Sequence, residues 1–263
     1  MNTFESLTNY YNTKDEHLRL SSRHGSIEFL TTVRYVEKYL FENASILEIG
    51  AATGRYSHYF AQRGYTVDAI ELIQHNIDVF NSLTEPDEKI TVRPGNALDL
   101  SFIPDETYDI TLLLGPMYHL YTVEEQLKAL SEAIRITKRK GKIFIAYCNT
   151  DMTIYQYCFK RNMMKYEMDR GMIDPDTFKL YSTPEEVFQM HRKFEIDELM
   201  QNFNTKRLHF VGTDMLTRLL DETVDTMDGE TFDLYLRYHF SICEREDMVG
   251  VTNHMLDVIE KIS

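Results

Sequence analysis

The sequence of 263 residues predicts an α/β fold, in which a largely parallel β-sheet carries helices on both faces. Short apolar runs alternate with amphipathic stretches between residues 45 and 149, which is typical of consecutive βαβ units. In addition, the first apolar run, 45–49, leads into the turn Gly50–Gly54 and then into an amphipathic stretch. Such a strand–turn–helix pattern brings a ligand or a helix N-terminus close to the backbone.

Residues 1–43 precede the alternating region. The first 23 are polar and contain several tyrosines, and we interpret them as an arm that either closes over a ligand as a lid or is disordered. The side chains that would form the lid are those of Tyr10, Tyr11, His17 and Arg19. A helix is expected near 25–41, because Phe29, Val33, Val36 and Leu40 recur there at helical spacing.

Between 44 and 149 the predicted elements follow in a regular order. Strands are expected at 45–49, 66–71, 89–93, 108–114 and 142–147, and helices at 55–63, 73–83 and 123–137. The last of these helices has a capping box, since Thr122 is followed three residues later by Glu125. The basic run 138–142 is expected to end this helix, with Gly141 just beyond its last residue.

The pattern changes after residue 150. Spacings of three and four residues predict one helix face that either packs in the core or covers a substrate, formed by Met152, Tyr155, Phe159, Met163 and Tyr166. Thr183 and Pro184 predict the start of another helix. A strand is expected at 205–211, helices at 213–227 and 230–246, and a last strand at 251–259.

The sequence contains no linker, repeat or low-complexity segment, so we interpret residues 1–263 as one domain. It divides into an N-terminal arm and helix at 1–43, a ligand-binding core at 44–149, a helical insertion at 150–200, and C-terminal strands and helices at 201–263.

The composition excludes several classes of function. The net charge of −14 argues against nucleic acid as a main partner, because phosphate binding relies on clustered Lys and Arg. Three scattered cysteines are too few for a disulfide framework or a zinc site. The N-terminus resembles no signal peptide and no apolar run approaches a membrane span, so we expect a cytoplasmic protein.

The side chains that carry chemistry follow the predicted strand ends, where ligands bind in sheets of this kind. Glu48 lies two residues before Gly50, and a carboxylate there is costly to bury unless a cationic or hydroxyl-bearing ligand pairs with it. Glu71 ends the second strand, 21 residues after Gly50, which suits it to accept hydrogen bonds from both ribose hydroxyls. The third and fourth strand ends supply 96–97 and 114–119.

The turn is not a dinucleotide fingerprint, G-x-G-x-x-G, because Ala52 and Arg55 stand where the second and third glycines would be. Its pattern, acid-x-G-x-A-x-G, instead resembles motif I of class I S-adenosylmethionine-dependent methyltransferases. The resemblance continues through 64–67, 95–100, 108–120 and 135–142. The stretch 108–120 is similar to the small-molecule, type 11 subgroup.

The resemblance implies a Rossmann-like fold with a seven-stranded, mostly parallel sheet, helices on both faces and an antiparallel last strand. Residues 205–211 and 251–259 would supply the last two strands. It also implies S-adenosyl-L-methionine as cofactor, direct displacement by an O, N or C nucleophile of a small molecule, and no metal. The insertion at 150–200 would cover the acceptor.

The resemblance also assigns roles to individual residues. The backbone of Gly50, Ala51 and Gly54 would hold the methionine moiety, and Glu48 would orient its ammonium. Glu71 would bind the ribose, Leu72 would pack on the adenine, and Asn96 and Ala97 would bind the adenine edge. Leu114 and Gly115 would line the sulfonium side. The chain departs from the family at Ala52, usually glycine, and at Asn96, often aspartate, whose side-chain oxygen still accepts a hydrogen bond.

Simpler explanations stay open for several of these residues. Glu48 could interact only with the following helix, Glu71 could be a surface acid, and Asn96 could be a turn residue. Tyr118 and His119 are candidate catalytic residues, His119 as a general base, with a structural role as the alternative. Two other functions also stay open, a non-catalytic S-adenosylmethionine-binding protein and a nucleotide-dependent oxidoreductase.

Overall fold

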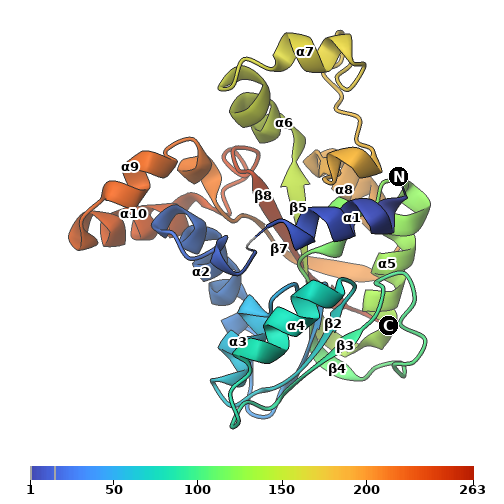
Figure 1. The fold of residues 1–263 in the computed structure, drawn as a ribbon. Coiled ribbons are helices and arrows are strands. Elements are labelled where there is room, and N and C mark those ends of the chain that lie inside the picture. Colours follow the sequence, from blue (N-terminus) through green and yellow to red (C-terminus); the bar gives the residue numbers. More distant parts are fainter. Residues whose placement is uncertain (1, 15) are drawn as a thin grey trace.

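The computed structural model describes residues 2–14 and 16–263, and this part of the chain forms one eight-stranded sheet (Figure 1). The strands run in the order β3-β2-β1-β4-β5-β8-β7, and the short β6 pairs with β5. Their bounds are β1 Ser45–Ile49, β2 Thr66–Glu71, β3 Ile90–Pro94, β4 Tyr108–Leu113, β5 Thr137–Asn149, β6 Met190–His191, β7 Thr205–Gly212 and β8 His254–Lys261.

All pairs are parallel except those of β8, which runs antiparallel to β5 and to β7. The antiparallel last strand and the two C-terminal strands are therefore confirmed. The two-residue β6 has no signal in the sequence, because a pair this short has no periodicity. The central strands are apolar because both faces are covered, as at Ile46 and Leu47, which are fully buried.

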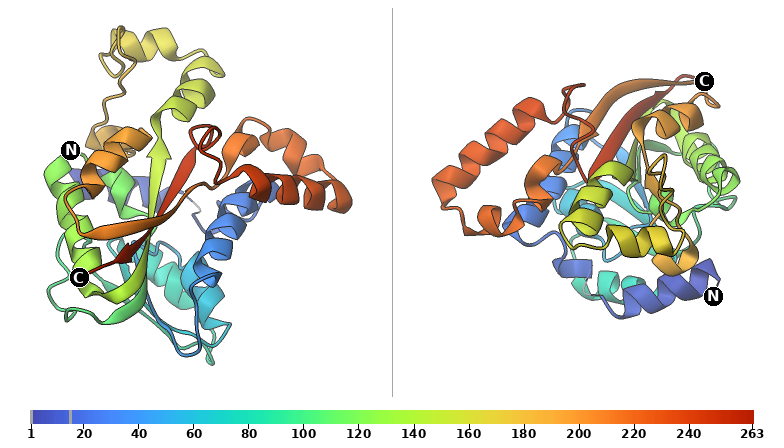
Figure 2. Two further views of the ribbon diagram at one scale, coloured as in Figure 1. Left: turned by 180° about the vertical axis from the view of Figure 1, so that it is seen from behind. Right: turned by 90° about the horizontal axis from the view of Figure 1, so that it is seen from above.

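Helices cover both faces of the sheet (Figure 2). On one face, α5 (Val123–Ile136) and α8 (Lys193–Met200) pack Leu130 and Ile196 against the strands. On the other face, α2 (Arg23–Glu37), α3 (Arg55–Ala61) and α10 (Gly229–Ile242) contribute Phe29, Phe60 and Ile242. The remaining helices are α1 Thr3–Asn12, α4 Gln74–Leu83, α6 Thr150–Thr153, α7 Met164–Asp169 and α9 Asp221–Thr226.

The basic run at 138–142 was expected to end a helix, and this prediction is wrong. Helix α5 ends at Ile136, and the run forms the first part of β5. Lys138 and Lys142 pair with Asp109 and Glu260 on neighbouring strands, at 2.9 and 2.8 Å. A Cβ atom on Gly141 would lie 2.6 Å from the Thr137 side chain, so this glycine permits a close approach and does not terminate a helix.

The single helix expected over 152–166 is also absent. The chain forms α6, then a π-helical turn at Ile154–Phe159, then α7, with Asn162 at a positive φ of 56° between them. This break removes the common face, so Tyr155 and Phe159 are 60% and 55% exposed. Thr183 and Pro184 begin only a three-residue turn, Pro184–Glu186. The segment stands beyond the carboxyl end of β5 (Figures 1 and 2).

The N-terminal arm is a helix where the sequence suggested a polar segment. In α1, Asn2 and Glu5 form a capping box, a signal that was present in the sequence. Leu7 of α1 is buried in a small apolar cluster with Ile73 and Val187. The side chain of His17 lies outside the described part of the chain. None of the helices that the structure describes combines the length and apolar character needed to cross a lipid bilayer.

Candidate cofactor and acceptor site

The turn Gly50–Gly54 lies where β1 and β4 end side by side, as the strand pattern predicts. Gly50 has a φ of 73°, and a Cβ atom there would lie 2.7 Å from the ring of Pro116. A Cβ atom on Gly115 would lie 3.0 Å from the carbonyl oxygen of Gly50. Both positions therefore need glycine, because the two strand ends touch through their backbones.

Ala52 and Gly54 differ from the roles expected for them in the turn. Ala52 has a φ of 47°, the left-handed region that glycine adopts more easily, and its amide donates to Glu71. Gly54 precedes α3 with a φ of 84°, and a Cβ atom there would lie 2.4 Å from the Phe80 ring. Gly54 is thus explained by helix packing, and it does not line any of the cavities described below.

Glu48 is almost fully buried and contacts the first turn of α3. Its Oε2 accepts hydrogen bonds from the Ser57 backbone amide, at 2.9 Å, and from the Ser57 hydroxyl. Burial raises the pKa of Glu48 to about 8, and the two Ser57 bonds lower it only in part. The contact to the helix that the simpler explanation proposed is therefore present, and the carboxyl group also lines a hollow beside the turn.

Glu71 is not a surface acid, because it is buried between two turns. Its Oε2 accepts from the Ala52 amide at 2.8 Å, and its Oε1 accepts from the Ile73 amide at 2.9 Å and from Asn76 Nδ2 at 3.2 Å. Burial raises its pKa, against the effect of these bonds. Glu71 therefore holds the turn after β1 against the turn after β2.

A cavity of about 210 Å³, which we call the turn cavity, lies against these two turns. It brings together most of the residues expected to bind the cofactor, namely Gly50, Glu71, Leu72, Asn96, Ala97 and Gly115. Asn96 Oδ1 also accepts from the Leu98 amide at 3.0 Å, so its role as a turn residue is real. Helix α1 covers the cavity with Leu7 and Tyr11.

The turn cavity continues into a small hollow of about 60 Å³, which we call the junction hollow. The two share Gly50, Ala52 and Gly115. The junction hollow adds Glu48, Ala51, Leu114 and Tyr118, and on the far side Glu16 and Arg19. All the predicted site residues except Gly54 therefore line one of these two connected spaces.

A third space of about 240 Å³, the polar chamber, follows the junction hollow. The two share Tyr11, Glu16, Arg19 and Tyr118. The chamber is otherwise lined by side chains from the insertion and the C-terminal part, among them Gln156, Phe188, Arg218, Asn253 and His254. The three spaces adjoin one another through these shared residues and outline a path from β2 to β8 along the carboxyl ends of the parallel strands.

The two candidate catalytic residues are held by hydrogen bonds. Tyr118 donates its hydroxyl to the Leu114 carbonyl at 2.5 Å, and burial raises its pKa. His119 lies with Nδ1 2.9 Å from the Val187 carbonyl, which can only accept, so Nε2 accepts from the Tyr11 hydroxyl at 2.9 Å. Burial lowers the pKa of His119 to about 4, so the ring is neutral near pH 7.

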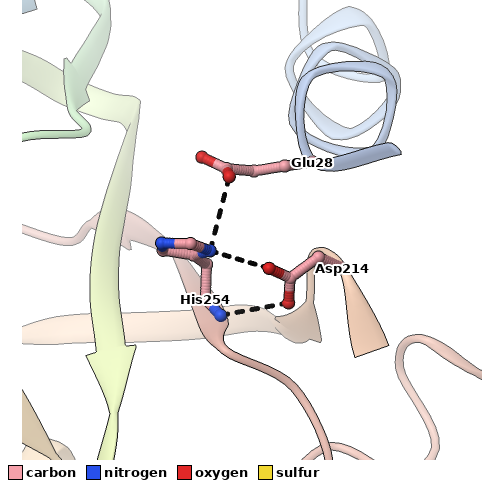
Figure 3. A group of neighbouring side chains, drawn as sticks. All are labelled: Glu28, Asp214 and His254. Atoms are coloured by element: carbon pink, nitrogen blue, oxygen red, sulfur yellow. Dashed lines mark hydrogen bonds and ion pairs between the residues drawn. The ribbon is translucent and has the colours of Figure 1, made fainter. Parts of the chain in front are cut away.

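Behind the polar chamber lies a group of buried charges, Glu28, Asp214 and His254 (Figure 3). His254 Nδ1 is 2.8 Å from Asp214 Oδ2 and 3.3 Å from Glu28 Oε2. Two guanidinium groups complete the group, since Arg19 and Arg218 lie 2.9 and 3.4 Å from Glu28. The carboxylates raise the pKa of His254 well above its usual value, so the ring is a cation.

This group has the residue types of a metal site but not its electrostatics. Three cations already balance the carboxylates, and the His254 nitrogen nearest to them carries a proton. A divalent ion would have to displace that proton and lie among the guanidinium groups. We therefore assign the group to ion pairing between α2, the end of β7 and the start of β8.

Sequence reasoning missed the residues of this group and of the polar chamber. Glu28, Asp214, Arg218, Asn253 and His254 come from segments far apart in the chain, and no short-range pattern links them. Of the lid residues that the sequence indicated, Tyr10, Tyr11 and Arg19 do line the chamber.

The comparisons with known proteins agree with this geometry. Residues 47–145 match a family model described as a methyltransferase domain. The chain is 23% identical over 203 residues to the ubiquinone biosynthesis O-methyltransferase of Rickettsia bellii, a match that covers 74% of this chain and 81% of the relative.

Solved structures share the fold at low sequence identity. A methyltransferase from Methanosarcina mazei aligns with a TM-score of 0.58 and 17% identity, over 87% of this chain and 97% of that one. A possible histamine N-methyltransferase from Thermotoga maritima aligns over both full chains, with a TM-score of 0.57 and 14% identity. A protein from Pyrococcus horikoshii gives a TM-score of 0.60 and 14% identity, over 96% and 98% of the two chains.

Proposed function

Because this chain is a class I S-adenosylmethionine-dependent methyltransferase, we propose that it transfers the methyl group to a small molecule bound in the polar chamber. One observation carries the proposal. The turn cavity, which contains the expected cofactor residues, shares wall residues with the junction hollow, and the junction hollow shares wall residues with the polar chamber. A space of about 240 Å³ approaches the size of pockets that hold small molecules.

The cofactor S-adenosylmethionine would lie along this path. Its adenosine would occupy the turn cavity, with the ribose beside Glu71 and the adenine between Leu72 and Asn96. Its methionine moiety would occupy the junction hollow, where the Gly50 and Ala51 backbone and the Glu48 carboxyl group lie. The sulfonium would then face Leu114 and Gly115, next to the entrance of the polar chamber.

The protein's contribution to catalysis would be placement and exclusion of water, since a sulfonium needs an in-line nucleophile more than an acid or base. Tyr118 lines both the junction hollow and the polar chamber, so it would form the wall beside the transferred methyl group. His119 is neutral and has both nitrogens engaged, which favours a positioning role through Tyr11. A nucleophile that enters already deprotonated needs no base.

Two further features support a small acceptor. The relative from Rickettsia bellii is, by its name, an O-methyltransferase of ubiquinone biosynthesis. The insertion 150–200 supplies Gln156, Phe188 and Met190 to the polar chamber, which supports its predicted role as the acceptor cover.

The test separates the three functions that the sequence left open. The purified protein is titrated by calorimetry with S-adenosylmethionine, S-adenosylhomocysteine and NAD, and it is then screened for S-adenosylhomocysteine release over a panel of small metabolites. The proposal expects binding of the first two, no binding of NAD, and turnover with a small acceptor. Cofactor binding without turnover on any small acceptor, or turnover only on protein or RNA, would contradict it.

A further inference from the structure

The polar chamber contains a cation and an amide that the protein itself leaves poorly paired. Arg218 approaches carboxylates only at 3.4 Å, to Glu28, and 3.6 Å, to Asp214. Arg19 in contrast makes three contacts to Glu28, at 2.9 to 3.2 Å, and one to Glu16 at 2.5 Å. Among the described residues, Arg218 is therefore the loosely held guanidinium of the group.

Asn253 lies at the same chamber and is only 7% exposed. Neither its Nδ2 nor its Oδ1 has a hydrogen-bond partner in the described part of the chain. Burying an amide without partners costs free energy, and a molecule that completed its bonding would recover that cost. The Asn253 backbone is fixed separately, since its amide donates to Asp214 at 2.8 Å.

A carboxylate matches these two side chains. The planar fork of arginine binds a carboxylate through two parallel hydrogen bonds, and the amide of asparagine can donate a third. The charges of this group are balanced, with Glu16, Glu28 and Asp214 against Arg19, Arg218 and His254. The hydrogen-bonding geometry of Arg218 and Asn253, and not a net positive charge, therefore selects the carboxylate.

The polar chamber also continues into an apolar one. An adjoining space of about 300 Å³ shares Thr153, Phe188 and Met190 with it. Apolar and aromatic side chains from the insertion form most of the remaining wall, namely Tyr157, Cys158, Met172, Ile173, Leu180 and Tyr181. We call this space the apolar chamber.

We propose that the methyl acceptor is an amphiphilic carboxylic acid, whose carboxylate binds Arg218 and Asn253 in the polar chamber and whose apolar part enters the apolar chamber. This inference rests on the proposed function and adds the chemical class of the acceptor. The carboxylate is the anchor of the acceptor, and the nucleophile is the group that faces Tyr118 at the junction hollow.

The test uses four probe molecules and the whole protein saturated with S-adenosylhomocysteine. Calorimetric titrations compare 3-phenylpropanoate with 3-phenylpropanamide, 3-phenylpropan-1-amine and propanoate, at one pH and ionic strength. The inference expects 3-phenylpropanoate to bind at least about tenfold more tightly than the other three, since only this probe has both the anion and the apolar body.

Three variants locate the binding. Arg218→Gln is expected to remove the preference for the acid over the amide. Asn253→Leu, which removes no hydrogen bond of the folded protein, is expected to weaken 3-phenylpropanoate about threefold or more. Arg245→Gln is the matched control, because Arg245 pairs with Asp247 on the surface and lies outside the chambers, and it should bind as the wild type does.

The outcomes separate the two proposals. Equal or tighter binding of the amine or the amide, no binding of the acid, or an acid preference that survives in both Arg218→Gln and Asn253→Leu would overturn the inference. If the wild-type protein does not bind S-adenosylhomocysteine, the proposed function is overturned instead. The affinity of each variant for S-adenosylhomocysteine shows that its fold and cofactor site are intact.

Discussion

Glu48 and Glu71 are buried carboxyl groups on neighbouring strand ends, and each combines a structural role with a proposed role in cofactor binding. Both accept hydrogen bonds from backbone amides, Glu48 from Ser57 in the first turn of α3, and Glu71 from Ala52 after β1 and from Ile73 after β2. Both also line the path proposed for the cofactor. The structural bonds orient each side chain, so that a ligand meets it already in position.

Replacement of Glu71 tests the ribose role. Glu71→Ala is expected to weaken S-adenosylmethionine binding at least about tenfold, because the ribose hydroxyls lose their acceptor and the Ala52 turn loses its brace. Calorimetry measures the change, with Glu42→Ala, an exposed acid before β1, as the matched control. An unchanged affinity in Glu71→Ala would reject the assigned role.

Replacement of Glu48 separates stability from binding. With a folded pKa of about 8 against about 4.5 when unfolded, Glu48 takes up a proton on folding between these pH values, so its contribution makes the protein less stable as pH rises. Glu48→Gln keeps an acceptor for Ser57 and removes this effect. We expect the variant to be more stable than wild type by about 1–3 kcal/mol at pH 8, with little gain at pH 5.

Above pH 8, where Glu48 is ionised, the same variant should bind S-adenosylmethionine about tenfold more weakly, because the ammonium group loses a carboxylate partner. Urea unfolding at pH 5 and pH 8, together with calorimetry, gives both readouts. A variant that is less stable at pH 8 and binds the cofactor normally would show that Glu48 serves only α3.

At the scale of elements, α1 is the cover of the turn cavity. Three contacts hold it there, the Leu7 cluster, the edge-to-face contact of Tyr10 with Phe188, and the bond from Tyr11 to His119. The partners of these contacts, Phe188, Val187 and His119, belong to the insertion and to the strand end that faces the junction hollow. Because α1 contacts the walls of both the turn cavity and the polar chamber, we expect its position to depend on both the cofactor and the acceptor.

Removal of one hydroxyl tests this coupling. Tyr11→Phe removes the hydrogen bond to His119 and keeps the ring. The free energy that holds α1 over the turn cavity should therefore fall by about 1 kcal/mol, and cofactor release should become severalfold faster. Hydrogen exchange of the amides in 3–12 should be slowed by S-adenosylhomocysteine in wild type and less so in the variant. If the exchange rates of the α1 amides are the same with and without S-adenosylhomocysteine, this helix is not a lid.

Sequence periodicity predicted the elements of the core well and those of the insertion poorly. From β1 to β4 the strand positions are correct within one residue, because each strand is a buried apolar run followed by a turn residue. In the insertion, the regular spacing from Met152 to Tyr166 is interrupted by a left-handed residue at Asn162. Periodicity does not reveal such a break, although Lys160 and Arg161 followed by Asn162 form a pattern typical of a helix C-terminus.

The site was predictable to the same extent. Glu48, Glu71, Asn96 and Gly115 were found because each lies at the carboxyl end of a strand or within two residues of it. Arg218, Asn253 and His254 could not be found, because they meet only when β8 inserts between β5 and β7. The residues around the proposed cofactor site can thus be recognised from short stretches of sequence. Those of the proposed acceptor site come together only through the order of the strands in the sheet.

At the scale of the whole molecule, the Glu28–Asp214–His254 group joins α2 to the C-terminal strands. Asp214→Asn is expected to destabilise the protein by about 3–5 kcal/mol, because it leaves the His254 cation buried with one partner fewer. Urea unfolding measures the change. Asp247→Asn, in an exposed pair with Arg245, should show none and serves as the control.

The pH dependence of this contribution follows from the directions of the pKa shifts. Nearby cations lower the pKa of Glu28 and Asp214, so their stabilisation is complete above about pH 4 and is lost as the pH falls below it. The pKa of His254 is raised, so its stabilisation is complete below about pH 6.5 and is lost as the pH rises toward its folded value. Asp214→Asn should reduce the loss of stability both at low pH and at high pH. The same pH dependence in the variant as in wild type would contradict the assignment of these losses to the Glu28–Asp214–His254 group.

A crystal structure with S-adenosylhomocysteine would locate the cofactor relative to both cavities. We predict adenine beside Asn96 and Leu72, ribose hydroxyls on Glu71, and sulfur at Gly115 facing the polar chamber. A ligand whose sulfur points away from Tyr118 and Arg218, or whose adenosine lies outside the turn cavity, would contradict this prediction.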